Sequence, residues 1–183
     1  ISHVFPERRK LPDIPNGFCS FVSMRSRPYR TAFVSKLSQT YKSVACGGSI
    51  MNNINAVIGP TAKDKQQFLQ CFKFCIAFEN ESVDTNMIGY TSEKIFEAFA
   101  AGVVPIYWGD PTVASIFNQK AFLNRHDFTT DEDFINEIIR VDQNDQLYRA
   151  MTNEPIFLHN QIPLSFYPQN VCMKLAELYH AKK

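Results

Sequence analysis

The stretch that most constrains the fold runs from Phe72 to Asp110 and reads as strand, loop, helix, strand. It begins with the mostly apolar run FKFCIAF, which is typical of a buried strand. After a polar loop, a helix ends at Gly102, and the apolar run VVPIYW forms a second strand. Two strands joined by a helix over this length are expected to be parallel. Ligands of open parallel sheets bind at the carboxyl ends of the strands, which here means Asn80–Lys94.

Strand and helix patterns alternate along the rest of the chain. Strands are expected at residues 18–23, 43–46 and 121–124, and helices at 28–41, 61–70, 130–141, 144–151 and 170–181. Asp110 followed by Pro111 predicts the start of one more helix. This alternation predicts a doubly wound α/β domain with a parallel sheet. Residues 1–17 are rich in proline and charge, which predicts a linker there and one domain over residues 18–183.

The composition argues against several classes of protein. A formal net charge of +1 does not favour bulk binding of nucleic acid or of anionic membranes. No apolar run approaches the ~20 residues that span a bilayer. The 5 cysteines show no metal-binding spacing, and their odd number predicts reduced thiols in a reducing compartment. We expect these thiols to be structural rather than catalytic.

The helix that opens near Tyr90 has the features of an anion site. Thr91 or Ser92 can cap it, which leaves its first N–H groups pointing into the crevice as unsatisfied donors. Lys94 adds a full positive charge beside them. A cation in a first turn opposes the helix dipole, and a bound phosphate would resolve that conflict.

Other polar residues are predicted to meet the same anion. Arg30 follows the first predicted strand and can grip a phosphate with two N–H groups. Glu93 can accept hydrogen bonds from sugar hydroxyls, Tyr90 can stack or hydrogen-bond, and Asn80 offers an amide. The set fits a nucleotide diphosphate that carries sugar hydroxyls. The alternative is that Arg30 is a solvated helix residue and that Glu93 and Lys94 form an exposed helix start.

Residues 72–110 resemble the donor-binding segment of the α-1,3/4-fucosyltransferase family. That family carries a pattern close to YKF-x-x-x-FEN, then Y-x-T/S-EK, then G-x-x-P-I/V-x-x-G. The matching residues here are FKF and FEN within 72–80, YTSEK at 90–94, and Gly102, Pro105 and Gly109. The resemblance reaches back to Arg30 and forward through residues 113–127, and it is closest to the bacterial members.

The resemblance implies a GT-B enzyme, of which this chain is one Rossmann-like half. The family transfers fucose from GDP-fucose to N-acetylglucosamine of a glycan acceptor, with inversion and in α-1,3 linkage. It builds Lewis-type antigens, here on a lipopolysaccharide. The acceptor would bind through an N-terminal domain that we expect to be absent from this chain, so that the chain alone transfers weakly or not at all. A bacterial cytoplasmic location is implied, with peripheral membrane association of the full-length protein left open.

Residue roles follow from the same resemblance. Arg30 and Lys94 would neutralise the diphosphate leaving group, and Glu93 completes the expected catalytic set. Glu93, Tyr90 and Asn80 would hold ribose, fucose or phosphate oxygens. No cofactor and no metal are expected, because the arginine and the lysine take the place of a divalent ion.

Two points stay open at the level of sequence. No general base is identified, because Glu79 and Glu81 are assigned to packing, loop capping or solvation, and the base is expected outside this chain. The loop before Tyr90 is longer than in the bacterial members, so the contacts of Asp84–Ile88 are not assigned. The alternative functions are a non-catalytic module that binds a nucleotide sugar and a transferase of a different nucleotide sugar.

Overall fold

The protein is seen in a computed structural model that describes residues 8, 10–59, 61–80, 88–163, 166–167 and 169–170. Its centre is a parallel sheet with the strand order β2-β1-β3-β4-β5. The strands are β1 (Gly17–Phe21), β2 (Val44–Cys46), β3 (Phe72–Phe78), β4 (Val104–Trp108) and β5 (Leu123–Asn124). In the register, Cys19 of β1 lies between Val44 and Phe74. The predicted parallel sheet is confirmed.

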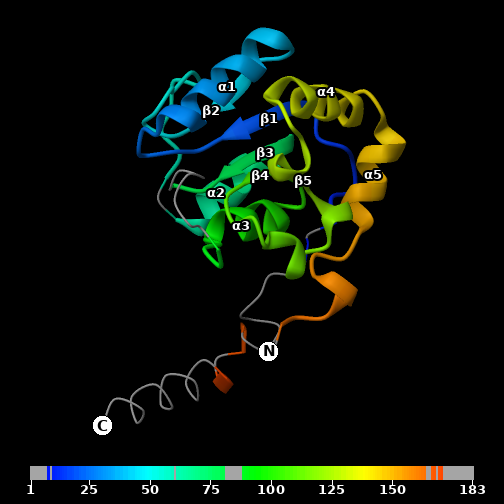
Figure 1. Ribbon diagram of the computed structural model, residues 1–183. Coiled ribbons are helices and arrows are strands. Elements are labelled where there is room, and N and C mark those ends of the chain that lie inside the picture. The colour runs from blue at the N-terminus through cyan, green and yellow to red at the C-terminus, as the bar shows by residue number, and fades with distance from the viewer. Residues whose placement is uncertain are drawn as a thin grey trace.

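Helices connect the strands and cover both faces of the sheet (Figure 1). The α-helices are α1 (Pro28–Thr40), α2 (Ala62–Leu69), α3 (Glu93–Ala101), α4 (Asp131–Asp142) and α5 (Asp145–Asn153). Short 3₁₀ turns are η1 (Val113–Ser115), η2 (Gln119–Ala121), η3 (Arg125–Asp127) and η4 (Leu158–Asn160). Among the described residues, no helix is both long enough and apolar enough to span a membrane.

The alternation of side chains along β3 explains why both faces need a cover. Phe74, Ile76 and Phe78 pack into a core with apolar residues of α1, α4 and α5. Cys75 and Ala77 point the other way and join the cores that contain α2 and α3. A strand with apolar side chains on both faces is stable only between two layers of helix. The predicted doubly wound α/β architecture is therefore confirmed.

Several helix ends carry capping residues. The side chains of Thr61, Thr130 and Asn144 accept hydrogen bonds from backbone N–H groups three residues ahead. Gly102 ends α3 in the left-handed region, with φ 83°, where a glycine is favoured.

Two predicted elements are shorter than expected. Asp110 does cap a turn, because it accepts from the Thr112 N–H, but only the 3₁₀ turn η1 follows. The strand predicted at 121–124 covers only Leu123–Asn124, since residue 121 belongs to η2. The division into a linker over 1–17 and a domain over 18–183 stays a prediction, because residues 1–7 and 9 lie outside the described part. The loop residues 81–87 and all but the first residue of the helix predicted at 170–181 lie outside it too.

The strand order defines one place where a crevice forms. β2 lies on one side of β1 and β3 lies on the other. The connection through α1 therefore crosses one face of the sheet, and the connection through α2 crosses the opposite face. In open α/β sheets, ligands bind outside the carboxyl ends of the strands at such a switch point.

Candidate functional site

A cleft of about 580 Å³ opens at the switch point between β1 and β3. Its apolar lining residues are Val22, Met24, Val57 and Ile58. Its polar lining residues are Ser23, Arg25, Arg30, Lys65, Asn80, Glu93, Lys94 and Glu97. Four of the five predicted site residues therefore meet in one cleft. The fifth, Tyr90, is 45% exposed and does not line the cleft.

Arg30 is a buried cation. It lies in the first turn of α1, is only 2% exposed and sits over the ring of Phe21. Its Nη1 donates to the Asn80 side-chain oxygen at 2.5 Å, and its Nε has no partner in the described part of the chain. Among the described residues, no carboxylate lies within ion-pair distance of it. Burial lowers the pKa of Arg30. The alternative of a solvated helix residue is therefore wrong.

Two arginines orient Asn80 at the carboxyl end of β3. The Nε of Arg27 donates to the Asn80 backbone oxygen at 2.7 Å, and Arg30 donates to its amide oxygen. An amide oxygen that faces a guanidinium leaves the amide nitrogen as the outward group. Asn80 lines the cleft, so its N–H₂ is the group of this side chain that remains to donate to a ligand.

The start of α3 differs from the prediction. Ser92 is the N-cap residue, but neither its side chain nor that of Thr91 caps the helix. The Ser92 N–H instead donates to Glu79 Oε1 at 2.8 Å, and the Ser92 hydroxyl donates to Glu79 Oε2 at 2.5 Å. Glu79 is fully buried at the end of β3. The chain's own carboxylate thus occupies part of the anion site that was predicted to be unfilled.

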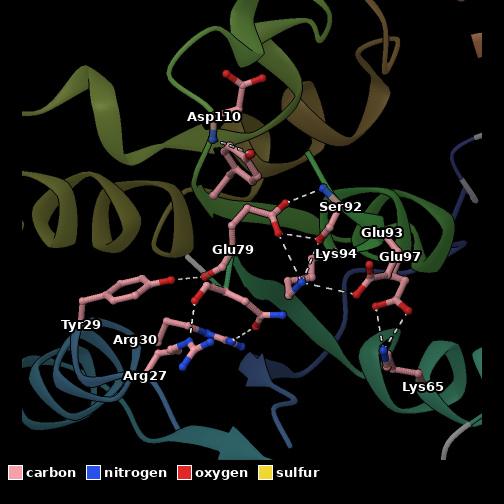
Figure 2. Close-up of polar contacts among 12 residues, drawn as sticks. Arg27, Tyr29, Arg30, Lys65, Glu79, Ser92, Glu93, Lys94, Glu97 and Asp110 are labelled. Atoms are coloured by element: carbon pink, nitrogen blue, oxygen red, sulfur yellow. Dashed lines mark hydrogen bonds and ion pairs between the residues drawn. The ribbon is translucent and has the colours of Figure 1, made fainter. Parts of the chain in front are cut away.

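Lys94 is held at the cleft wall by several acceptors (Figure 2). Its Nζ lies 2.8 Å from Ser92 Oγ, 3.3 Å from Glu79 Oε2 and 3.4 Å from Glu93 Oε1, and its side chain is 15% exposed. The two carboxylates offset the conflict between this cation and the helix dipole. The alternative was that Glu93 and Lys94 form an exposed helix start. The Glu93 side chain is 63% exposed, but that of Lys94 is not, so the alternative holds for Glu93 alone.

Glu93 is poised to carry a negative charge. Partial burial raises the pKa of this carboxyl, but its own backbone N–H and the adjacent Lys94 outweigh that effect. The net result is a pKa below the usual range. Glu93 is therefore ionised at neutral pH and can accept hydrogen bonds from hydroxyl groups.

Sequence comparison decides the family. A model of the C-terminal region of glycosyltransferase family 10 (fucosyltransferase) matches residues 15–153. This chain belongs to glycosyltransferase family 10.

Relatives within and around family 10 share this stretch. The α-(1,3)-fucosyltransferase FucT of Helicobacter pylori is 37% identical over 163 residues, which is 84% of this chain and 32% of that protein. Human GDP-fucose protein O-fucosyltransferase 3 is 29% identical over 128 residues, or 66% of this chain and 26% of that protein. This chain thus spans about a third or less of the length of these curated relatives.

A solved structure shares the fold. A crystal structure of an α1,3-fucosyltransferase with GDP-fucose superposes with a TM-score of 0.68 at 37% identity. The match covers 75% of this chain and 38% of that one. The family and the α/β fold expected from the resemblance are confirmed.

Sequence reasoning missed several residues of this family 10 cleft. Lys65 of α2 pairs with both carboxylate oxygens of Glu97 of α3, at 2.8 and 3.0 Å. Met24 and Val57 add apolar surface to the cleft lining, which suits a flat ring. Met24 and Val57 lie in loops without a periodic pattern, and Lys65 and Glu97 lie on helices at positions that no motif marks.

Potential metal ligands and cysteine thiols are two further features of this family 10 chain that affect its chemistry. In the part of the chain that the structure describes, no group of three or more His, Cys, Asp or Glu side chains is arranged to hold a metal ion. The four described cysteines, Cys19, Cys46, Cys71 and Cys75, are free, and Cys172 lies outside the described residues. Burial raises the pKa of Cys75 to about 12, which leaves it a poor nucleophile.

Proposed function

We propose that this chain is the donor-binding part of an inverting α-1,3-fucosyltransferase that uses GDP-fucose. The observation that carries the proposal is Arg30, a buried cation at the switch point of a family 10 chain. A buried charge is costly unless an opposite charge meets it. Within the described residues, the Arg30 Nε has no protein partner and its Nη1 contacts only a neutral amide, so an anionic ligand is the missing partner.

The proposed reaction gives each cleft residue a task. Cleavage of the bond between fucose and phosphate leaves negative charge on GDP, and fixed cations stabilise that charge as it develops. Arg30 and Lys94 neutralise the diphosphate and so take the role that a divalent metal ion has in other enzymes. Glu93 and the amide nitrogen of Asn80 hold sugar or phosphate oxygens. Tyr90 completes the set by reaching the donor from outside the described cleft lining.

The acceptor and the cellular setting are also proposals. We favour N-acetylglucosamine of a glycan, such as a Lewis-type structure on a lipopolysaccharide, because the H. pylori relative is an α-(1,3)-fucosyltransferase. The similarity to a GDP-fucose protein O-fucosyltransferase supports a protein acceptor as the second candidate. We propose a cytoplasmic location, with peripheral membrane association of the full-length protein as the variant to be tested.

Calorimetry with GDP tests the donor site. We expect the 183-residue chain to bind GDP. The Arg30→Ala and Lys94→Ala variants should each lose about tenfold or more in affinity, as expected for charge-assisted hydrogen bonds. The matched control is Arg140→Ala, which removes a cation that is 60% exposed on α4. Unchanged affinity in both cleft variants would contradict the diphosphate assignment.

A competition panel separates the alternative functions. We expect GDP-fucose to displace labelled GDP more strongly than GDP-mannose or UDP-galactose does. A preference for another donor would identify a transferase of a different nucleotide sugar. Transfer assays on the full-length protein with a lactosamine glycan and with a folded protein acceptor then distinguish the two acceptor classes. Donor binding without transfer to either would favour a non-catalytic module.

A further inference from the structure

Glu79 is a buried carboxylate beside the cleft to which the proposed reaction gives no task. It is fully buried at the carboxyl end of β3 and lies between the loop after β4 and the start of α3 (Figure 2). Its side chain accepts hydrogen bonds from the Ser92 N–H and hydroxyl and contacts the Lys94 ammonium. All three contacts come from donors, which is the pattern of a carboxylate rather than of a protonated acid.

The surroundings hold Glu79 in one place. The Tyr29 hydroxyl of α1 donates to its backbone oxygen. The Glu79 N–H donates to the Trp108 carbonyl of β4 at 2.8 Å. A side chain at Gly109 would collide with the Glu79 Cγ atom, so the loop after β4 packs closely against the Glu79 side chain. Contacts from α1, β4 and α3 therefore fix a residue that does not itself line the cleft.

Lys94 depends on Glu79 for its position. A lysine side chain has four rotatable bonds, and ordering it costs roughly 2 kcal/mol of entropy if nothing holds it. Glu79 and Ser92 already hold the ammonium at the cleft lining. The longest of its three contacts, 3.4 Å to Glu93, is the one that a phosphate oxygen can most easily replace.

We propose that Glu79 is a positioning residue for the diphosphate. Its carboxylate fixes the first turn of α3 and the Lys94 ammonium in the orientation that a phosphate needs, before the nucleotide binds. The inference rests on the proposed function, because Lys94 is taken as a diphosphate ligand. Glu79 acts through Lys94 and does not touch the nucleotide.

The direction in which Glu79→Gln changes GDP affinity distinguishes a positioning role from a purely electrostatic effect. Glu79→Gln keeps the shape and removes a negative charge near an anion site, so Coulomb's law alone predicts tighter GDP binding. Positioning predicts the opposite, a loss of about tenfold in GDP affinity measured by calorimetry. The matched control is Glu137→Gln, which removes a carboxylate that pairs with Arg140 on α4, outside the cleft lining. We expect this control to bind GDP as tightly as the parent chain.

A double-mutant cycle of Glu79→Gln with Lys94→Ala tests whether Glu79 affects GDP affinity through Lys94. If Glu79 acts through Lys94, Glu79→Gln lowers GDP affinity by less than about twofold in the Lys94→Ala background. An equal loss in both backgrounds would mean a purely structural role, and unchanged or tighter binding in the single variant would also overturn the proposal. Should Glu79→Gln fail to fold, Ser92→Ala replaces it, since it removes the hydroxyl that bridges Glu79 and Lys94.

A measurement without nucleotide keeps this inference separate from the proposed function. In the unliganded chain, hydrogen exchange by NMR follows the Ser92 amide and the Lys94 ammonium. We expect Glu79→Gln to accelerate both exchange rates by at least about tenfold, with the Cys19 amide of β1 unchanged. Equal rates in the two proteins would overturn the positioning role. Failure of the parent chain to bind GDP would instead overturn the donor site, whatever the exchange rates show.

Discussion

Arg30 and Glu79 are buried charges at the candidate site, and burying a charge lowers the stability of the fold unless a partner compensates for it. Arg30 carries a charge into the interior, with a neutral amide and an aromatic ring as its partners. Glu79 carries the opposite charge and takes three donors from one turn of α3 and its cap. Such groups are kept where they serve a site, because an apolar residue would pack at lower cost. The two charges differ in one respect: among the described residues, Glu79 has hydrogen-bond donors and an ion pair, whereas no carboxylate lies within ion-pair distance of Arg30.

Gly109 packs closely against the Glu79 side chain. A Cβ atom there would collide with Glu79 Cγ and lie 2.6 Å from the Tyr107 hydroxyl. We expect Gly109→Ala to lower the free energy of unfolding by about 1–3 kcal/mol, as overpacking does. It should also weaken GDP binding, because Glu79 must move. Urea denaturation and calorimetry measure the two effects.

Gly89→Ala is the control substitution for Gly109→Ala, because an added Cβ meets no described neighbouring atom there. Gly89 has φ 80°, and no described atom lies within 4 Å of the place that a Cβ would take, so only backbone strain applies there. We expect a smaller loss, about 1 kcal/mol, from that strain. A Gly109→Ala protein with parent stability and parent GDP affinity would contradict the packing argument for Glu79.

At the level of elements, an ion-paired cluster far from the cleft holds α4 to the sheet. Asp142, the last residue of α4, accepts from the Tyr41 hydroxyl at 2.8 Å and from the Lys42 ammonium at 2.6 Å. Lys73 of β3 lies 3.3 Å from its other oxygen. Burial raises the pKa of Asp142, but these donors outweigh it and leave the pKa below the usual range. The cluster thus joins α4, the end of α1 and β3.

The lowered pKa of Asp142 fixes the pH dependence of its contribution. A carboxyl with a depressed folded pKa stabilises the fold above the unfolded value, about pH 4 for aspartate, and loses that stability as pH falls through the folded value. We expect Asp142→Asn to cost about 2 kcal/mol at pH 7, the scale of hydrogen bonds to a charged group. The difference from the parent chain should shrink as the pH is lowered below about 4.

Urea denaturation across this pH range measures the effect. The control is Glu137→Gln, which breaks the exposed pair with Arg140 on the same helix and should cost less than about 1 kcal/mol. A cost for Asp142→Asn that is the same at pH 7 and pH 3 would show that the charge of Asp142 does not stabilise the fold.

The elements show what the sequence could and could not predict. The run 72–78 was predicted as a strand with its observed bounds, and Gly102 and Thr61 mark helix ends as expected. These signals are local, because apolar alternation and caps act within a few residues. The bond from Ser92 to Glu79 spans 13 residues and the contact of Arg30 with Asn80 spans 50. Such contacts depend on which strands become neighbours, and single-sequence patterns do not encode that.

The same limit applies to the predicted site. Arg30, Asn80, Glu93 and Lys94 do line one cleft, because each follows a strand whose carboxyl end lies at the switch point. A capping role was among those expected for Glu79, but the sequence did not show that it caps the start of α3, since burial and rotamer decide which acceptor reaches the Ser92 N–H. The ligand roles of all five predicted residues, Tyr90 included, stay predictions.

At the scale of the whole molecule, the cleft joins the two helical layers. Arg30 comes from α1 on one face of the sheet, while Lys65, Glu93 and Lys94 come from α2 and α3 on the other. A ligand that contacts both layers binds only when the entire sheet is folded. Its binding free energy therefore adds to the stability of the whole unit rather than to one helix.

Thermal unfolding with GDP tests this coupling. At a GDP concentration about one hundred times the Kd, binding adds about 2.7 kcal/mol to the free energy of unfolding. For a chain of this size that corresponds to a rise in Tm of roughly 5–10 °C, which we expect in a single cooperative transition. A tenfold loss of affinity in Arg30→Ala should remove about half of the shift at the same GDP concentration, and a larger loss should remove more. Arg140→Ala should retain the shift, because Arg140 does not line the cleft. Two separate transitions, with only one of them shifted by GDP, would show instead that the layers unfold independently and that the nucleotide contacts only one of them.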